Sequence, residues 1–358
     1  MADHQHVERI KLRDFRCYAG AQVAFEPGVN LMLGANAAGK TSLLEAVCVM
    51  LRLNSPRASR LATLVRHGAH GLVVDGRYGG HHLQLYYSST RRKLALDSIE
   101  RKSASEFLAL GRAVYFANDD IRLVRDGDAG RRRLLDFLGA QALPGYRATA
   151  RRYEKALQSR NRLLKSAASP ARDELQAFSG ELVRHGEELT RLRRRLVGML
   201  RPPARNAHQE TAAGGGVLEI GYDAGAGDDL AARLDQLGPE ERRLRQTLAG
   251  PHRDAIPLTL DGMPAAEFAS EGQQRTIALA LRMAEGGILR EDAGHGRPVY
   301  LIDDVFGELD PSRRHALLAA LPSDCQWLVT CTSSGWMDDA FTPAASYQVG
   351  AGAVRRVG

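Results

Sequence analysis

The chain has 358 residues, 44% of them hydrophobic and 25% charged, which is typical of a globular protein with a sizeable core. No apolar run reaches membrane-spanning length and the first residues lack signal-peptide character, so the sequence predicts a cytoplasmic protein and excludes a membrane-embedded class. The net charge of +7 suits an anionic partner, and it also suits solubility alone. The four cysteines lie far apart without C-x-x-C spacing, which argues against a zinc site or a disulfide framework.

The first part of the chain reads as a sheet that leads into a phosphate-binding loop. Strands are predicted over Val7 to Leu12, Gln22 to Phe25 and Val29 to Leu33, and a helix over Ser42 to Leu51. The loop between them consists of Gly34, Ala35, Asn36, Ala37, Ala38, Gly39, Lys40, Thr41 and Ser42, which fits G-x-x-x-x-G-K-[ST]. A simple glycine turn would explain the glycines, but the strand before and the helix after favour a phosphate site.

Such a loop suits a nucleoside triphosphate with Mg²⁺. Its backbone N–H groups and the positive end of the following helix attract phosphate. Lys40 is predicted to lie between the β- and γ-phosphates, and the Thr41 hydroxyl is predicted to bind Mg²⁺. Ala37 stands where glycine would be less strained if the backbone φ is positive.

Beyond the loop helix, the pattern changes from strands to helices. Gly71 to Tyr87 predicts two strands that turn at Gly79 and Gly80, and Ala113 to Phe116 predicts another. From about residue 131 to 205, apolar residues recur at helical spacing and strand signals are almost absent. One helix is expected over about Tyr146 to Lys165, and a second is expected to carry a heptad seam, with a break near Ser169 and Pro170 between them. The seam consists of Leu175, Phe178, Leu182, His185, Leu189, Leu192, Leu196 and Met199.

Positive charge is concentrated in this helical segment. Residues 131–205 contain 18 Arg and Lys against 7 Asp and Glu, an excess of 11. Such a surface suits phosphate backbones, because each neutralised phosphate releases condensed counterions. A cluster at Arg191, Arg193, Arg194 and Arg195 lies mostly off the seam, where it fits either a solvated face or a nucleic-acid contact.

A second group of motifs follows a flexible link at Thr211 to Gly216. A strand is expected over Val217 to Tyr222, a helix over Leu230 to Leu248, and a hairpin turning at Asp261-Gly262. Ser270 to Arg275 then opens a long helix that reaches about Leu289. Ser270 and Gln273 fit a capping box, and the same residues would present a hydroxyl and a helix N-terminus to another subunit's γ-phosphate.

Two adjacent carboxylates end the apolar strand Val299 to Asp304. Like charges this close raise each other's pKa unless metal or solvent stabilises them. Asp303 therefore fits a partner of Mg²⁺, whether direct or through water, and Asp304 fits the residue that positions or deprotonates an attacking water. A solvated strand end is the alternative, and the phosphate loop elsewhere in the chain argues against it.

The C-terminal part of the sequence contains a predicted helix start and a strand that ends in hydroxyls. Asp310 and Pro311 are suited to the N-cap and first turn of a helix reaching Ala320. The strand Trp327 to Thr332 ends in hydroxyls that could sense a γ-phosphate, although a threonine with satisfied hydrogen bonds is the simpler interpretation for Thr330 or Thr332.

The ordered motifs resemble the RecF family of recombination-repair ATPases, which belong with SMC-like ABC-type ATPases. The similar stretches span nearly the whole chain, from Leu12-Arg13-Asp14-Phe15-Arg16 and Lys155 to Lys165 through Gly250-Pro251-His252-Arg253-Asp254 to Ser270 to Arg275. Departures are local: Asn118 to Asp136 lacks the usual proline and acid, Ala255 replaces an acid, Ser55-Pro56-Arg57 follows its counterpart loosely, and a Q-loop glutamine is not identified.

This resemblance implies an α/β fold, with a P-loop ABC-type ATPase head at 1–130 and 206–358 and a mainly helical inserted arm at 131–205. It also implies an ATP- and Mg²⁺-dependent homodimer in which Ser270 of one subunit meets the nucleotide of the other, with Arg16 and Thr332 among the nucleotide contacts. Slow hydrolysis at Asp304 would then release the dimer.

The partners that the resemblance implies are DNA at single-strand/double-strand junctions, together with RecR and RecO in loading RecA. Arg131, Arg132, Arg191 and Arg194 are the predicted DNA contacts. A transporter-type ABC ATPase is the first alternative, and the basic arm argues against it. The second is an SMC-like clamp or a nuclease-coupled ATPase, but no carboxylate cluster outside the ATP site suggests a nuclease.

Overall fold

The computed structural model describes residues 5–58, 60–166, 172–211, 215–291, 296–337 and 341–358. Contacts divide the chain into two compact units: unit 1 comprises residues 1–120 and 285–358, and unit 2 comprises residues 121–284. The predicted break near Ser169 and Pro170 and most of the predicted link after Thr211 lie outside the described residues. The division into a head and an arm at 131–205 stays a prediction.

Unit 1 contains two six-stranded sheets. The first has the order β2-β1-β4-β5-β6-β7 with antiparallel pairing throughout. Its strands are β1 (Val7–Phe15), β2 (Tyr18–Ala24), β4 (Gly71–Tyr78), β5 (His81–Ser88), β6 (Arg92–Leu96) and β7 (Ile99–Glu100). The hairpin predicted at Gly79 and Gly80 is confirmed, because both glycines adopt positive φ between β4 and β5.

The second sheet of unit 1 has the order β15-β14-β3-β13-β12-β8, and only β15 runs antiparallel to its neighbour. The strands are β3 (Val29–Leu33), β8 (Ala113–Ala117), β12 (Val299–Asp303), β13 (Trp327–Cys331), β14 (Ala345–Gly350) and β15 (Ala353–Arg356). β12 and β13 are buried along their whole length, which explains why the sequence reads as unbroken apolar runs there.

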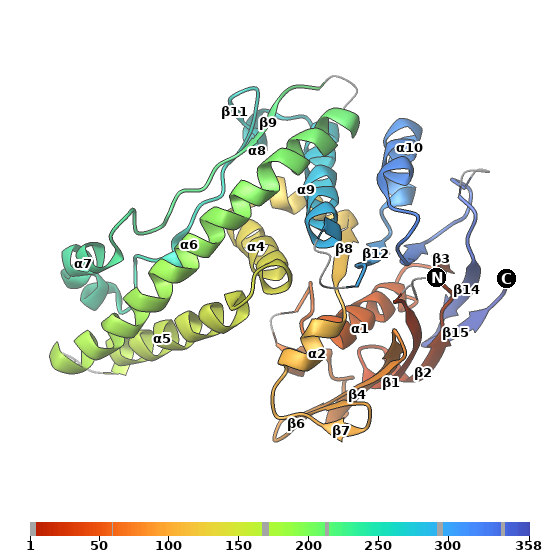
Figure 1. The fold of residues 1–358 in the computed structure, drawn as a ribbon, viewed down its shortest axis with the longest axis horizontal. Helices are drawn as coiled ribbons and strands as arrows, with labels where there is room; N and C mark the ends of the chain where they lie inside the picture. The colour runs from red at the N-terminus through yellow and green to blue at the C-terminus, as the bar shows by residue number, and fades with distance from the viewer. Residues whose placement is uncertain (1–4, 59, 167–171, 212–214, 292–295, 338–340) are drawn as a thin grey trace. The chain divides into compact units, whose positions relative to one another are not determined.

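Helix α1 (Lys40–Arg52) packs against strands of both sheets (Figure 1). Nearly all of its residues are buried, including the charged Lys40, Glu45 and Arg52 among the apolar ones. Short helical segments and α10 complete unit 1: η1 (Leu61–Leu64), α2 (Ser105–Leu110), η4 (Phe306–Glu308) and α10 (Pro311–Ala320), with η2 (Asn118–Ile121) at the unit boundary. The predicted start of α10 is confirmed, because the Asp310 side chain accepts a hydrogen bond from the Arg313 N–H.

Unit 2 is mainly helical. Helix α5 (Tyr146–Ser166) lies beside α6 (Arg172–Thr211), as Figure 1 shows, and both pack on α4 (Ala129–Ala142). The remaining elements are α3 (Arg122–Arg125), β9 (Leu218–Ile220), α7 (Leu230–Leu244), η3 (Pro251–Arg253), β10 (Leu258–Leu260), β11 (Met263–Pro264), α8 (Ala265–Phe268) and the first part of α9 (Glu271–Glu291). The three strands form a small antiparallel sheet.

The heptad seam on α6 is confirmed at its centre, where Leu182, His185, Leu189, Leu192 and Leu196 are buried. Two boundaries differ from expectation. Helix α6 passes through Pro202 and Pro203 to Thr211, beyond the end expected near Arg205. Helix α7 ends at Leu244 and not at Leu248, because Arg245 takes a left-handed conformation that caps it.

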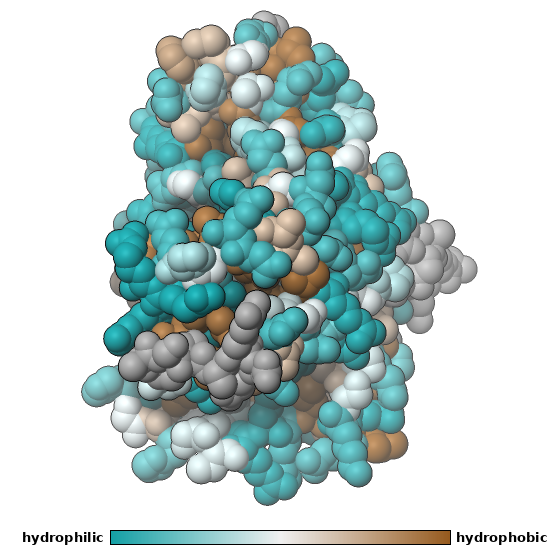
Figure 2. Space-filling view, turned by 90° about the vertical axis from the view of Figure 1, so that its left-hand side faces the viewer, coloured by the Kyte–Doolittle hydropathy of each residue, from teal (hydrophilic) through white to brown (hydrophobic). Residues whose placement is uncertain are grey.

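Hydrophilic residues cover most of the face drawn in Figure 2, and hydrophobic residues show as small separate areas among them. Among the described residues, no helix has the length and apolar character needed to cross a membrane.

Candidate nucleotide site

The phosphate loop lies where parallel strands of unit 1 end. Residue Leu33 of β3 pairs with Cys331 of β13, and Asp303 of β12 pairs with both Thr330 and Ala117. Because parallel strands end at the same edge of a sheet, the loop, the two carboxylates and the Thr330 to Thr332 segment meet there. In open α/β sheets, this edge is where ligands bind.

The two glycines of the loop are required for different reasons: neighbouring atoms leave no room for a side chain at either position, and Gly39 also has a positive φ. A Cβ at Gly34 would lie 2.3 Å from the Val349 carbonyl oxygen. Gly39 has φ 110° directly before α1, and a Cβ there would meet the Tyr18 hydroxyl at 2.8 Å. Ala37 adopts φ 62°, so the strain anticipated for a positive φ at this position is present. Asn36 is exposed and Ser42 is half-buried.

Lys40 is held inside the loop. Its ammonium group donates to the carbonyl oxygens of Gly34, at 2.8 Å, and Ala35, at 3.1 Å. The Asp304 carboxylate lies 3.6 Å from the same nitrogen. These contacts place the one loop cation next to the carboxylate predicted to activate water.

The Asp303 carboxylate is surrounded by three hydroxyl donors. Thr41 and Thr330 donate to Oδ1 at 2.9 and 2.8 Å, and Tyr115 donates to Oδ2 at 3.0 Å. Burial raises the pKa of Asp303, and the three hydroxyls act against that rise because they stabilise the charged form. The structure thus brings together the two residues predicted to bind Mg²⁺, Thr41 and Asp303.

Asp304 differs from its neighbour in exposure and backbone conformation. Its side chain is 33% exposed and its φ is 55°. Its N–H donates to the carbonyl oxygen and to the hydroxyl of Thr330, at 3.2 and 3.1 Å. Thr330 is therefore a strand-end threonine with satisfied hydrogen bonds that links the Asp303 carboxylate to the Asp304 backbone, whereas Thr332 is exposed at the sheet edge.

Arg16 is engaged within unit 1 next to α1. Its guanidinium donates two hydrogen bonds of 2.8 Å to the buried Glu45 carboxylate and one of 3.1 Å to the Thr63 carbonyl. Ser55 donates to the same carboxylate at 2.5 Å. The predicted nucleotide contact of Arg16 stays a prediction, since its charge is already paired here.

Ser270 lies in unit 2 at the start of α9, and the capping box predicted there is present. The Gln273 side chain accepts from the Ser270 N–H at 2.8 Å, and the Ser270 hydroxyl accepts from the Gln273 N–H at 3.3 Å. Ser270 is exposed. The side chain is thus available to an external group at the positive end of a long helix.

The arginines predicted to contact DNA are all engaged with protein groups. Arg131 donates to the Asp128 carboxylate and to carbonyl oxygens of α3, and Arg132 donates to the Asp254 carbonyl at 2.5 Å. Arg191 pairs with Glu188 and Arg194 with Asp228, both at exposed positions. Exposed pairs exchange readily with solvent, so Arg191 and Arg194 are more available to a phosphate than Arg131.

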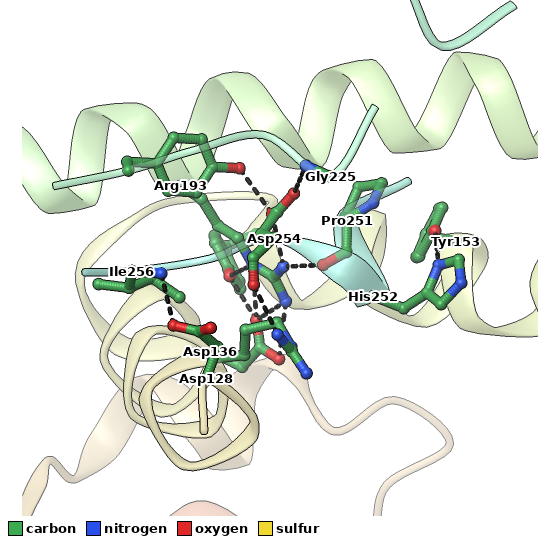
Figure 3. A network of polar contacts seen from close by, with 12 residues as sticks. Asp128, Asp136, Tyr153, Arg193, Gly225, Pro251, His252, Asp254 and Ile256 are labelled. Carbon is green, nitrogen blue, oxygen red and sulfur yellow. Dashed lines mark hydrogen bonds and ion pairs between the residues drawn. The ribbon is translucent and has the colours of Figure 1, made fainter. Parts of the chain in front are cut away.

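Arg193 is not part of a solvated face, and that interpretation of its position was wrong. Its guanidinium lies between the Asp136 and Asp254 carboxylates, at 2.8 Å from each, and also donates to the Pro251 carbonyl (Figure 3). Only 4% of Arg193 is exposed. Spacing along a helix shows which face a residue occupies, but not that a carboxylate from a distant loop covers that face.

The segment Gly250 to Asp254 is fixed by the same network. Asp254, which is 0% exposed, also accepts hydrogen bonds from the Tyr222 hydroxyl and the Gly225 N–H. The His252 ring lies 2.6 Å from the Tyr153 hydroxyl (Figure 3), and burial lowers the pKa of His252. This motif therefore ties the long helices of unit 2 to the loop before β10.

The chain matches the family model described as the RecF/RecN/SMC N terminal domain over residues 6–354. The DNA replication and repair protein RecF of Symbiobacterium thermophilum is 36% identical over 346 residues, covering 91% of each chain. RecF of Anaeromyxobacter sp. is 37% identical over 367 residues, covering 96% of this chain and 97% of the relative. This chain belongs to the RecF family.

Solved structures agree with the RecF assignment. A structure described as the recombination mediator protein RecF with ATP in the RecFOR pathway superposes with a TM-score of 0.89 at 27% identity, covering 99% of this chain and 98% of that one. An Smc head bound to a domain of ScpA gives a TM-score of 0.54 at 15% identity, which supports the shared fold alone. The predicted α/β fold of an ABC-type ATPase is confirmed.

Sequence reasoning missed two contributors to this RecF-family site. The sequence pattern predicts Tyr115 only as part of an apolar strand and Glu45 only as part of the loop helix. Each is a polar side chain inside an otherwise apolar element, and a buried polar group needs a hydrogen-bonding partner. That mismatch was the available signal, but it does not indicate which partner is used.

Proposed function

We propose that this chain is an ATP-dependent recombination-repair mediator that dimerises on ATP, binds gapped DNA and releases it after slow hydrolysis. The observation that carries the proposal is the junction of Thr41 and Asp303, which come from opposite ends of the sequence and share a hydrogen bond beside the phosphate loop. The relatives named for DNA replication and repair, and the similar structure with ATP, support the same activity.

ATP would bind with its phosphates against the loop N–H groups, with Lys40 leaving its carbonyl partners for the phosphates. The residues fit Mg²⁺, because Thr41 and Asp303 offer only oxygen donors and Mg²⁺ takes few protein ligands alongside phosphates. When bound, Mg²⁺ would neutralise charge on the transferred phosphoryl group.

Asp304 is the proposed residue that orients or deprotonates the attacking water. Its partial exposure leaves it accessible to water, and its contact with Lys40 would loosen once phosphates compete for the ammonium group. Asp303, by contrast, is enclosed by hydroxyls and suited only to hold the cation. The two neighbouring carboxylates therefore have separate roles.

The dimer is proposed to place Ser270 of one subunit at the γ-phosphate of the other. The exposed Ser270 hydroxyl and the N-terminus of α9 support this role. ATP would then act as a switch between separate subunits and the closed dimer. The size of the population shift would depend on how much more tightly ATP binds the dimer than the separate subunits.

DNA is the proposed anionic partner, with single-strand/double-strand junctions as the preferred form and RecR, RecO and RecA as protein partners. The charge excess of residues 131–205 supports DNA contact by unit 2. Arg191 and Arg194 are the proposed contacts, since Arg131 and Arg132 serve largely to hold unit 2 together.

A transporter-type or other SMC-like ABC ATPase is the competing function. The response to gapped DNA distinguishes the proposed function from the competing one, because a transporter ATPase would respond to a membrane subunit and not to DNA. Sedimentation velocity with ATP and Mg²⁺, with and without gapped DNA, tests the proposal directly. Conversion to a dimer with ATP and a larger DNA-bound species are expected, and a monomer under all conditions would refute the proposed function.

A further inference from the structure

Tyr115 is a buried polar residue of strand β8, which otherwise presents Ala113, Val114 and Phe116 to the core. Only 2% of Tyr115 is exposed, and β8 pairs in parallel with β12 so that Tyr115 is level with Leu301, two residues before Asp303. A buried phenol normally needs a hydrogen-bonding partner for its hydroxyl. Here that partner is not a backbone carbonyl but Oδ2 of Asp303, at 3.0 Å.

The three donors to Asp303 are divided unequally between its two oxygens. Oδ1 accepts from Thr41 and Thr330, and Tyr115 is the one donor to Oδ2 among the hydrogen bonds found in the described residues. An ionised carboxylate has about four acceptor positions. With three filled by hydroxyls, about one position remains for a further partner.

The Thr41 hydroxyl shows why the orientation of this carboxylate matters. Because Thr41 donates its proton to Asp303, the lone pairs of its oxygen are left for a cation. The terminal torsion of an aspartate is soft, so a carboxylate held at one oxygen alone can rotate. The contact from Tyr115 to Oδ2 holds the second oxygen and so resists that rotation.

We propose that Tyr115 is a positioning residue that fixes the Asp303 carboxylate in the orientation required for Mg²⁺ with ATP. It acts through Asp303 and does not touch the cation itself. The inference rests on the proposed ATP- and Mg²⁺-binding function. It adds a residue whose removal weakens the response to Mg²⁺ without weakening the contacts of the loop with the nucleotide.

Tyr347 provides a matched control in the same unit. It is also 2% exposed, and its hydroxyl donates to the Ala24 carbonyl oxygen at 2.6 Å. The same hydroxyl lies 3.3 Å from the Asn30 Oδ1 atom. Tyr347→Phe therefore removes buried phenolic hydrogen bonds whose acceptors are neutral groups and not Asp303. A general effect of losing such a bond would appear in both variants.

The experiment measures affinity for a fluorescent, slowly hydrolysed ATP analogue in the full chain over a series of Mg²⁺ concentrations and in EDTA. Loss of a partner that orients a metal ligand typically lowers metal affinity 10- to 100-fold. Tyr115→Phe is therefore expected to raise the Mg²⁺ concentration at half-maximal response by about tenfold or more. Its affinity in EDTA should match that of the wild type, and Tyr347→Phe should match the wild type throughout.

Three outcomes have distinct meanings. A Mg²⁺ midpoint in Tyr115→Phe equal to the wild type overturns the inference, and so does an equal shift in Tyr115→Phe and Tyr347→Phe. A wild type whose nucleotide affinity does not depend on Mg²⁺ overturns the proposed Mg²⁺ site, and a wild type that does not bind the analogue overturns the proposed ATP site itself. If Tyr115→Phe does not fold, 3-fluorotyrosine at position 115 keeps the hydroxyl and strengthens it as a donor, and a midpoint above the wild type would then contradict the inference.

Discussion

The Thr41 hydroxyl lies 2.9 Å from Oδ1 of Asp303, although 262 positions separate the two residues in the chain. Strands β3 and β12 do not pair directly, because β13 stands between them in the sheet. The contact between Thr41 and Asp303 therefore forms only when β13 has paired with β3 and β12 has paired with β13. The nucleotide site and the core of unit 1 are completed together.

Lys40→Met should weaken ATP binding strongly and abolish the ATP-induced dimer. The ammonium group is the one loop cation, and methionine keeps the length of the side chain while removing its charge. Nucleotide affinity is expected to fall at least about 100-fold, which corresponds to about 2.7 kcal/mol. Fluorescent ATP titration and sedimentation measure the two effects. Lys11→Met, at an exposed position of β1, is the control, and ATP-dependent dimers in Lys40→Met would contradict the assignment.

Asp304→Asn should trap a long-lived ATP-bound dimer. The amide keeps the shape of the residue but cannot take a proton from water, so binding persists while turnover falls by about 100-fold or more. Phosphate release and sedimentation after ATP removal measure the two properties. Glu308→Gln changes a nearby exposed acid and should turn over normally. Normal hydrolysis in Asp304→Asn would assign the water-activating role to another group.

Much of unit 1 could be predicted from the sequence because its signals are local. The loop pattern, its flanking strand and helix, and the acids ending an apolar strand each lie within a few residues. The partners of Tyr115 and Glu45 could not be predicted, since hydrogen bonds between different strands, helices and loops depend on how these elements pack together. The same limit explains Arg193: its charge suggested solvent, and the covering carboxylates of Asp136 and Asp254 come from elsewhere in unit 2.

Arg193→Ala should destabilise the protein strongly. It leaves the buried Asp254 carboxylate without its cationic partner, and breaking such a buried pair typically costs about 3–5 kcal/mol. Urea unfolding followed by circular dichroism measures the change. Arg191 lies two positions before Arg193 on the same helix and forms an exposed ion pair with Glu188. Arg191→Ala should therefore change the free energy of unfolding by no more than about 0.5 kcal/mol. Equal losses in the two variants would show that the network in Figure 3 contributes little.

Stability should fall as the pH is lowered below about 6.5, the ordinary pKa of histidine. Burial lowers the pKa of both His208 and His252 in the folded chain, so the unfolded chain binds more protons in that range. The loss amounts to at most about 1.4 kcal/mol per pH unit for each histidine, until the folded pKa is reached. Urea unfolding at a series of pH values should show a shallower dependence for His252→Gln, whereas the exposed His67→Gln should follow the wild type. An unchanged slope in His252→Gln would contradict this assignment.

Replacing Arg191 and Arg194 by Gln should weaken binding to gapped DNA and flatten its salt dependence. Each phosphate contact contributes a slope of about 0.9 in the logarithm of affinity against the logarithm of salt, so two lost contacts lower it by up to about 1.8 per subunit. Fluorescence anisotropy titrations at salt concentrations from about 50 to about 300 mM measure this slope. Lys11→Gln with Arg355→Gln removes the same charge from exposed positions of unit 1 and separates a local contact from a change in net charge. Equal slopes for the two double variants would mean that Arg191 and Arg194 act only through overall charge, because a direct phosphate contact releases counterions at its own site.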